Sequence, residues 1–311
     1  MPIPRGLRGL RGLSLNNPEV ASHSRSERLA YLALGAGVLS LGFSAILVRW
    51  AAAPGVVSSF YRMAIATVAV AAPFAIRMYK GSWPPWSALR LALLGGIFFA
   101  ADLAAWASGV VLSGATNPTL LANTAPLWVG LGAMMLFRQR LTPAFWIGTV
   151  IAMVGAGFVL GLEPEEQTIG SLLGLLAAVF YAGYFLVTQL GREKLDSLSY
   201  FWFAAMSSAA MLLLLSWGLD QPLSGYPPAT YLTFVGMAVV TQIFGYFTVS
   251  FALGYLPASI VAPTLLGQPV ITAILAGALL GETLSSAQIL GGLGVLAGVF
   301  VVVRSQQDSR P

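Results

Sequence analysis

Two stretches decide the fold of this chain: TAPLWVGLGAMMLFRQRLTPAFWIG at 124–148 and GQPVITAILAGALLGETLSSAQILG at 267–291. Each stretch has an apolar segment with an early proline, a short polar turn and a second, glycine-containing apolar segment. The two stretches align at an offset of 143 residues, which pairs Pro126 with Pro269. Other pairs in this register are Leu141 with Leu284 and Gly148 with Gly291. The paired prolines indicate an internal duplication.

The composition excludes a soluble protein. Of the 311 residues, 57% are hydrophobic and only 9% are charged, and the mean hydropathy is +0.81. Soluble domains carry about 25% charged residues. A chain this apolar has lipid as its main solvent, so soluble enzymes, DNA-binding domains and disordered chains are excluded. The net charge of +5 is small, and the placement of the basic residues is informative about topology, not about nucleic acid.

The hydrophobic stretches predict an all-α membrane protein with ten transmembrane helices. A membrane-spanning helix needs roughly 20 mainly apolar residues. Prolines and short polar stretches separate the windows that meet this requirement. These windows are 30–49, 54–76, 89–112, 116–137, 143–161, 169–190, 197–218, 229–252, 257–280 and 285–303.

The basic residues give the orientation. If the N-terminus is cytoplasmic, ten spans place all but two of the 16 Lys and Arg residues on the cytoplasmic side. Arg49 then lies outside, Arg62 lies within a span, and the acidic stretch 163–166 lies outside. This bias follows the positive-inside rule, so we expect an even number of spans with both termini cytoplasmic.

The duplication and the span count together predict two inverted repeats. Five spans are an odd number, so the second copy inserts with the opposite orientation, as in many secondary transporters. We therefore expect these parts: a basic cytoplasmic tail at 1–29, a first five-helix repeat at 30–161, an acidic external loop at 162–168, a second five-helix repeat at 169–304 and a cytoplasmic tail at 305–311.

With these motifs, the sequence resembles the drug/metabolite transporter superfamily, specifically its EamA-type ten-helix exporters. The resemblance covers the chain after residue 29. It departs from the family at 138–140, where Arg-Gln-Arg replaces the frequent Gly-Glu-Arg. The motifs that carry it are the proline–turn–glycine pattern at 126–148 and 269–291, Phe60-Tyr61-Arg62, Gly245-Tyr246 and Leu256-Pro257-Ala258.

The resemblance implies a substrate cavity lined mainly by the first, third, fourth, sixth, eighth and ninth spans. Polar and aromatic side chains on matching spans are the candidates for this cavity. They are Asp102, Trp106, Asn123, Thr124, Tyr181, Tyr184, Gln242, Tyr246 and Gln268.

Two charged residues lie inside predicted spans. Asp102 is the only carboxylate well within one, and Arg62 lies at a similar depth on the second span. Ionisable groups inside the membrane usually face a cavity or a partner. Asp102 can contact a substrate ammonium or couple protons. The alternative is a structural ion pair with Arg62 that fixes the bundle.

The remaining candidates also have two interpretations each. Pro126 and Pro269 remove a backbone donor and are expected to bend their helices beside the cavity, as hinges or gates. Gln242 and Gln268 can bind substrate or another helix. The deep aromatic residues can stack on a substrate or simply pack.

The predicted function is export of small metabolites, with aromatic or other apolar amino acids first, across the bacterial cytoplasmic (inner) membrane by alternating access. Alternatives are efflux of lipophilic cationic drugs and antiport of nucleotide sugars or sugar phosphates. The last class needs several cationic residues, whereas only Arg62 lies inside a span. A passive channel with the same fold is a further alternative.

An enzyme is not expected. The chain has no cysteine, its single histidine is His23 in the tail, and no paired aspartates or phosphate-binding loop occur in the spans. We expect no catalytic residue, no metal site and no cofactor. The expected partners are a small-molecule substrate and the lipid bilayer, without nucleic acid, and one chain is expected to work as a monomer.

Overall fold

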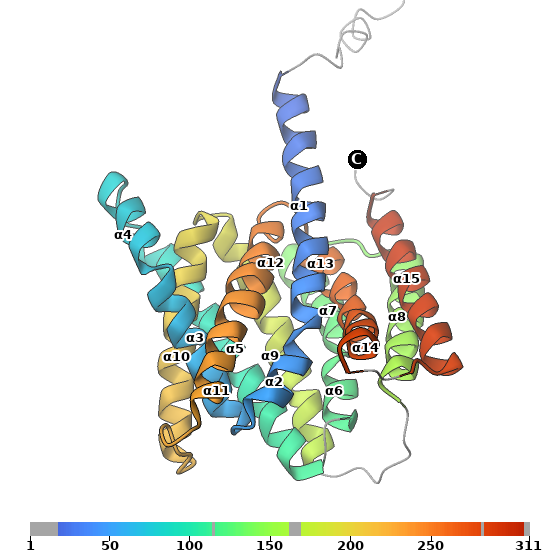
Figure 1. The fold of residues 1–311 in the computed structure, drawn as a ribbon. Helices are drawn as coiled ribbons and strands as arrows, with labels where there is room; N and C mark the ends of the chain where they lie inside the picture. The colour runs from blue at the N-terminus through green and yellow to red at the C-terminus, as the bar shows by residue number, and fades with distance from the viewer. Residues whose placement is uncertain (1–17, 114–115, 162–168, 281–282, 308–311) are drawn as a thin grey trace, which may run out of the picture.

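The computed structural model describes residues 18–113, 116–161, 169–280 and 283–307, and every regular element in these ranges is a helix (Figure 1). The helices before residue 162 are α1 (Pro18–Gly42), α2 (Ser44–Ala51), α3 (Gly55–Ala69), α4 (Ala71–Lys80), α5 (Trp86–Ser113), α6 (Thr116–Ala122), α7 (Ala125–Phe137) and α8 (Pro143–Leu160).

The later helices follow in the same up-and-down manner. Two of their spans contain π-helical or 3₁₀ segments, labelled η1 and η2. The elements are α9 (Ile169–Arg192), α10 (Ser197–Gly218), α11 (Pro228–Gly236), η1 (Met237–Tyr246), α12 (Phe247–Ala252), α13 (Ala258–Thr264), η2 (Leu265–Gly267), α14 (Gln268–Leu280) and α15 (Ser286–Gln307).

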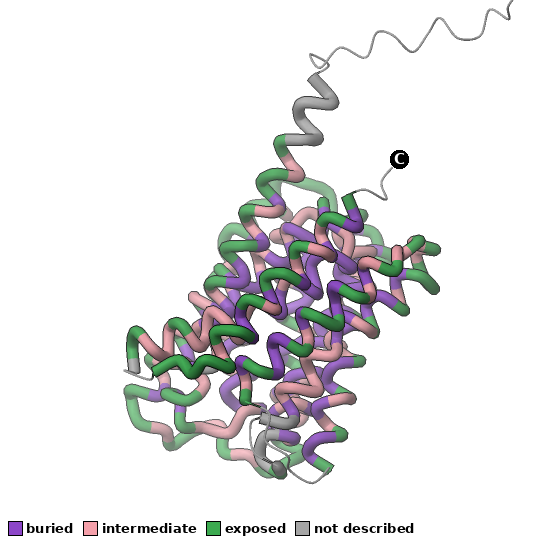
Figure 2. Tube along the Cα trace, turned by 90° about the vertical axis from the view of Figure 1, so that its right-hand side faces the viewer, coloured by how far each residue is buried: buried purple, intermediate pink, exposed green. Residues whose placement is uncertain are grey.

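The predicted all-helical membrane fold is confirmed. Among the described residues, nine helical stretches are long and apolar enough to cross a membrane, and the bent pair α3 and α4 makes a tenth. Each of the ten predicted windows overlaps one of these spans. Buried residues gather on the inward faces of the helices (Figure 2). Large apolar side chains such as Leu290 and Phe300 are exposed on the outside, where lipid surrounds a membrane protein.

The first helix begins earlier than the sequence predicts. Residues 18–29 were assigned to the basic tail, but α1 starts at Pro18 and the first candidate span starts at Arg25. Proline suits the first turn of a helix, and neither glycine nor proline follows before Gly35. Only residues 1–17 of the predicted tail lie outside the described ranges.

The paired prolines do not lie within continuous helices. The span at 118–137 is broken between α6 and α7, and Pro126 is the second residue of α7. The corresponding span breaks at η2, and Pro269 is the second residue of α14. At this position a proline removes no intrahelical hydrogen bond. Both repeats therefore interrupt the same span at the same place, with the proline starting the second segment.

Two further irregularities are absent from the sequence prediction. The second span bends by 45° at Val70, between α3 and α4. In the eighth span, η1 is a ten-residue π-helical segment. Such segments are rare and often mark functional sites.

The two halves of the chain are interleaved. The helices α5 and α9 pack along each other, as do α8 and α15, while α7 contacts α13 and α1 contacts η1 and α12. Glycines allow a close approach between α8 and α15. A Cβ atom at Gly155 would lie 2.5 Å from the Gly291 carbonyl oxygen, and one at Gly298 would lie 2.5 Å from that of Gly148.

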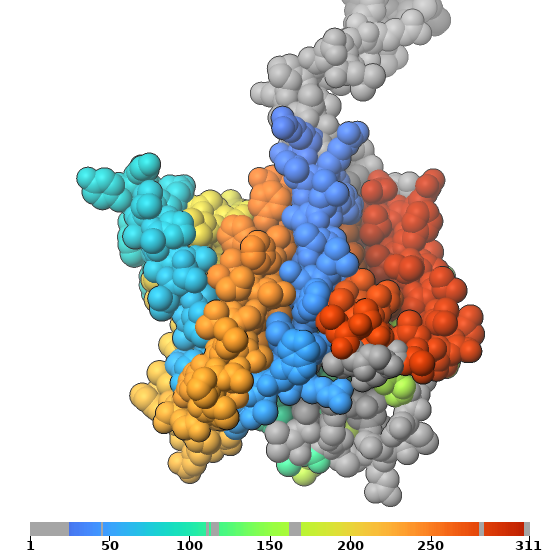
Figure 3. Space-filling view, viewed as in Figure 1, coloured from blue at the N-terminus to red at the C-terminus, as the bar shows by residue number. Residues whose placement is uncertain are grey.

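The start of α1 and the end of α15 lie at the same end of the bundle, as an even number of spans requires (Figure 1). We call this end the terminal end and the opposite one the far end. In the view of Figure 3, α1 and α2, the orange helices α11 and α12 and the red-orange α14 form one continuous face of the bundle.

Candidate functional site

One polar cavity lies inside the bundle. Its volume is about 370 Å³, within the usual range for ligand pockets. It reaches from Tyr181 and Tyr246, in the middle of their spans, to Gly55, Leu160 and Gln288 at the far ends of theirs. Residues from both halves of the chain line it, so the cavity lies at the interface of the two repeats.

Arg62 and Asp102 both face this cavity. Their exposed fractions are only 3% and 7%, and no ion pair joins the two side chains. The Nε and Nη2 atoms of Arg62 are buried without a hydrogen-bond partner. A direct ion pair, the alternative interpretation of these two residues, is not formed in this conformation, although both residues line one site.

Aromatic rings hold the Arg62 guanidinium in place. Its central carbon lies 5.8 Å from the ring centroids of both Phe99 and Tyr246, within cation–π distance of two neighbouring rings. The Tyr246 hydroxyl lies 3.1 Å from the hydroxyl of Tyr181. The rings of Tyr181 and Tyr246 give the middle of the cavity an aromatic wall beside its charged groups.

Hydrogen-bonding groups from α5, α6 and the two broken spans also line the cavity. The Trp106 Nε1 atom donates to the Thr119 hydroxyl at 3.0 Å. The Nδ2 atom of Asn123, in the break before α7, is buried without a partner. Gln268 and Pro269, at the matching break in the second repeat, also line the cavity. Both breaks thus face the same space.

Eight of the twelve predicted residues line the cavity, and four lie elsewhere. Tyr184 is buried behind the wall and stacks on Phe99 at 4.6 Å. Thr124 bonds within its own chain segment, donating to the Leu121 carbonyl at 2.6 Å. Pro126 is buried at the start of α7. Gln242 is buried in η1, with its Oε1 atom unpartnered.

Sequence reasoning missed several small polar residues of the cavity. Ser59, next to the Arg62 turn of α3, was overlooked because the second span was not assigned to the lining. Thr119 and Thr272 carry a weak signal, since hydroxyl groups are common in membrane helices. Gln288 starts the tenth span and donates to the Val159 carbonyl at 3.4 Å. The only feature of the sequence that could have indicated Gln288 is a polar residue at the end of a span.

Hydrogen bonds close the terminal end of the bundle between the repeats. Gln139 Nε2, from the turn after α7, donates to Ser259 Oγ at 2.8 Å and to Gln306 Oε1 at 2.7 Å. The backbone amide of Ala258 donates to Gln189 Oε1 at 2.7 Å. We refer to Gln139, Ser259 and Gln306 as the terminal cluster. It joins the first repeat to α13 and α15.

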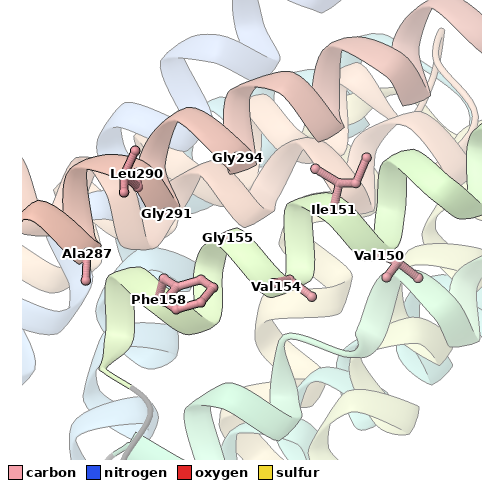
Figure 4. Close-up of a pocket in the computed structure, with 9 residues that line it drawn as sticks. All are labelled: Val150, Ile151, Val154, Gly155, Phe158, Ala287, Leu290, Gly291 and Gly294. Atoms are coloured by element: carbon pink, nitrogen blue, oxygen red, sulfur yellow. The ribbon is translucent and has the colours of Figure 1, made fainter.

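The larger hollow of about 460 Å³ is not the candidate site. It lies between α8 and α15, and the side chains that line it, including Val154, Phe158 and Leu290, are all apolar (Figure 4). Several are among the exposed residues that face lipid. A groove without polar groups cannot select a polar solute. No group of three potential metal ligands occurs in the described part of the chain.

A bundle of ten spans around one polar cavity, built from two interleaved halves, defines a membrane transporter. The model of the EamA-like transporter family matches residues 28–161 and again 168–304. The chain belongs to this family, which is a family of transporters and not of enzymes. The two matches show that the chain carries two EamA domains, in agreement with the internal duplication.

Several known transporters match this chain at low identity. A riboflavin transporter of Brucella anthropi is 32% identical over 103 residues, which are 32% of this chain and 36% of the relative. A second riboflavin transporter, of Rhizobium johnstonii, is 25% identical over 52% of either chain. A transporter of Archaeoglobus fulgidus is 25% identical over 90% of this chain and 98% of its own.

The first relatives are matched over part of their length only. The chain spans 60% of the Bacillus subtilis transporter YdfC, at 21% identity, and about a third of the Brucella protein. A crystal structure superposes with a TM-score of 0.76 at 19% identity and covers 89% of this chain and 98% of that one. That likeness concerns the fold.

Proposed function

We propose that this EamA-family secondary transporter exports small aromatic or other apolar amino acids across the bacterial cytoplasmic membrane by alternating access. One observation carries the proposal: a cavity between the two repeats combines a buried cation, a buried carboxylate and an aromatic wall. Charges inside a membrane protein are retained where they serve a solute or a partner. Arg62 and Asp102 have no direct ion-pair partner in the described structure.

The orientation and the division of the chain are part of the proposal. The terminal end faces the cytoplasm, which the basic residues at helix ends on that side support, among them Arg77, Lys80 and Arg304. The repeats extend over 30–161 and 169–304, and the two matches to the family model support these limits. The cavity lies within one chain, so the monomer is the transporting unit.

A second candidate substrate is riboflavin, because two relatives are named riboflavin transporters. Riboflavin has a flat aromatic ring system that suits the wall of Trp106, Tyr181 and Tyr246. It carries no carboxylate and no ammonium, so it leaves Arg62 and Asp102 without charged partners. The two candidates therefore make opposite demands on the charged groups.

The test is solute flux in proteoliposomes that contain the purified full chain. Vesicles are loaded with labelled phenylalanine, tryptophan, riboflavin or a lipophilic cation, and efflux is compared with that from protein-free vesicles. Amino-acid efflux that depends on the protein supports the proposal. If only riboflavin or only the cation leaves the vesicles, that compound is the substrate and the amino-acid proposal is wrong. An uphill gradient that an uncoupler abolishes separates coupled transport from passive diffusion.

The matched variants exchange a carboxylate for its amide at two positions. Asp102→Asn changes the cavity, whereas Glu193→Gln changes an exposed carboxylate at the terminal end. We expect the first to reduce amino-acid flux at least tenfold and the second to leave it unchanged. Equal effects of the two substitutions contradict a role for the cavity.

A further inference from the structure

Two nitrogens of Arg62, Nε and Nη2, are buried without a hydrogen-bond partner. They form one edge of the guanidinium, and this edge can make the paired hydrogen bonds of an arginine–carboxylate contact. An unpaired buried cation is costly, so the site gains most from a ligand that supplies an anionic group.

The rings of Phe99 and Tyr246 contact Arg62 without being hydrogen-bond partners of its buried nitrogens. The central carbon of its guanidinium lies 5.8 Å from each ring centroid. Cation–π contacts stabilise the charge without occupying its N–H donors. Since both nitrogens are buried in this conformation, a ligand reaches them only when the groups that cover them shift.

Asp102 supplies the opposite charge in the same cavity. No hydrogen bond or ion pair from the described part of the chain engages its carboxylate, and it stays more than hydrogen-bond distance from Arg62. Two unpaired and opposite charges in one space of about 370 Å³ match a ligand that carries both an ammonium and a carboxylate group.

We propose that Arg62 binds the carboxylate and Asp102 binds the ammonium of one zwitterionic headgroup, while Trp106, Tyr181 and Tyr246 contact its apolar remainder. This inference rests on the proposed function and goes beyond it, because it assigns each end of the substrate to a residue. The transporter then discriminates by the presence of both charges, and it rejects amines, acids and neutral aromatic compounds of the same size.

The experiment uses binding to the purified full chain in detergent, read as the shift of its melting temperature with ligand concentration. The probes are phenylalanine, phenylalanine amide, phenethylamine and 3-phenylpropionate, which share one ring and differ in the headgroup. We expect phenylalanine to bind at least tenfold more tightly than each of the other three. Equal binding of phenylalanine and its amide overturns the role of Arg62, and equal binding of phenylalanine and phenylpropionate overturns that of Asp102.

Variants assign the two ends. Arg62→Gln is expected to bind phenylalanine and its amide equally, and Asp102→Asn to bind phenylalanine and phenylpropionate equally. Arg62→Lys keeps the charge but not the paired donors, so it retains part of the preference. If a variant does not fold, the wild-type probe series still decides the question.

The binding measurement tests the headgroup assignment, and the flux measurement tests export, so the two hypotheses can fail separately. Headgroup-dependent binding without flux in proteoliposomes leaves the inference intact and contradicts export of amino acids. Flux without headgroup discrimination supports export and overturns the inference. If none of the four probes changes the melting temperature, the zwitterionic headgroup is excluded as the ligand of this site.

Discussion

The residues that stand out in this bundle are the ionisable ones that lie among apolar side chains. Arg62 and Asp102 stand out in the sequence because ionisable groups are rare within spans, and both line the cavity. The hydroxyl pair of Tyr181 and Tyr246 could not be foreseen in the same way. Its two partners come from different spans, and only their packing brings the oxygens to 3.1 Å.

The tyrosine pair predicts an energetic coupling. Tyr181→Phe and Tyr246→Phe each remove one hydroxyl and keep the ring, so packing is retained and the hydrogen bond is lost. A typical neutral hydrogen bond contributes about 0.5–1.5 kcal/mol. We expect a double-mutant cycle in chemical unfolding to give a coupling energy of that size. Additive effects of the two substitutions contradict a direct contact.

The start of α10 predicts a pH-dependent contribution to stability. Asp196 accepts hydrogen bonds from the Leu198 and Ser199 amides and the Ser199 hydroxyl, and it lies 3.4 Å from Arg77. Burial alone raises the pKa of Asp196, but the bonds from Ser199 and the charge of Arg77 outweigh it and lower the pKa. A lowered folded-state pKa stabilises the protein above the unfolded value, about 3.9, and this stability is lost as the pH falls through the folded-state pKa.

We therefore expect Asp196→Ala to destabilise the protein at pH 7 by about 1 kcal/mol, the usual contribution of a helix cap. The difference from wild type shrinks below pH 4, when the carboxylate becomes protonated. Melting temperatures of both proteins at pH 7 and pH 3 measure this change. A difference that stays constant over this range contradicts the role of the charge.

At the scale of helices, α8 and α15 form a tight contact through glycines. Gly155→Ala places a methyl group 2.5 Å from the Gly291 carbonyl oxygen, so the two helices must move apart. Overpacking of this kind costs about 1–3 kcal/mol. Gly35→Ala is the matched control, because a Cβ atom there meets nothing within 4 Å. We expect a lower melting temperature for the first variant only.

The sequence predicts where helices exist better than how they are interrupted. Hydrophobic length alone locates all ten spans. The breaks before Pro126 and Pro269 depend on where each proline falls relative to the helix start. The bend at Val70 and the π-helical η1 have no local sequence signal. Arg138, directly after α7, adopts a left-handed conformation with φ of 52°, which only the turn geometry reveals.

The candidate site is predictable to a similar degree. Charged and large aromatic residues on the expected spans mostly line the cavity, because few other polar groups exist there. The misses have a common cause. Ser59 and Gln288 lie on spans that the family resemblance did not assign to the cavity, and Tyr184 faces the correct side but is one layer behind Phe99.

For the whole molecule, the position of the cavity predicts from which side of the membrane a reagent can enter it. The cavity extends to the far end, and the terminal cluster closes the other end. The chain has no cysteine, so single cysteines can be introduced without background. In vesicles of known orientation, we expect Thr272→Cys to react with an impermeant maleimide from the far side, and Ser259→Cys to react from neither side.

Weakening the terminal cluster changes this pattern. Gln139→Ala removes the donor that joins Ser259 and Gln306. We expect it to raise the labelling of Ser259→Cys from the terminal side severalfold. Labelling of Thr272→Cys from the terminal side alone contradicts the arrangement of the two ends.

The interleaving of the halves also bears on how the chain is made. During synthesis, α5, α7 and α8 enter the membrane before α9, α13 and α15, the helices against which they pack, exist. The small-residue surface of α8 meets lipid until α15 has been made. The contacts between the halves therefore form only after α15 has entered the membrane, and we expect a chain cut at the junction of its halves to give two pieces that are stable only together.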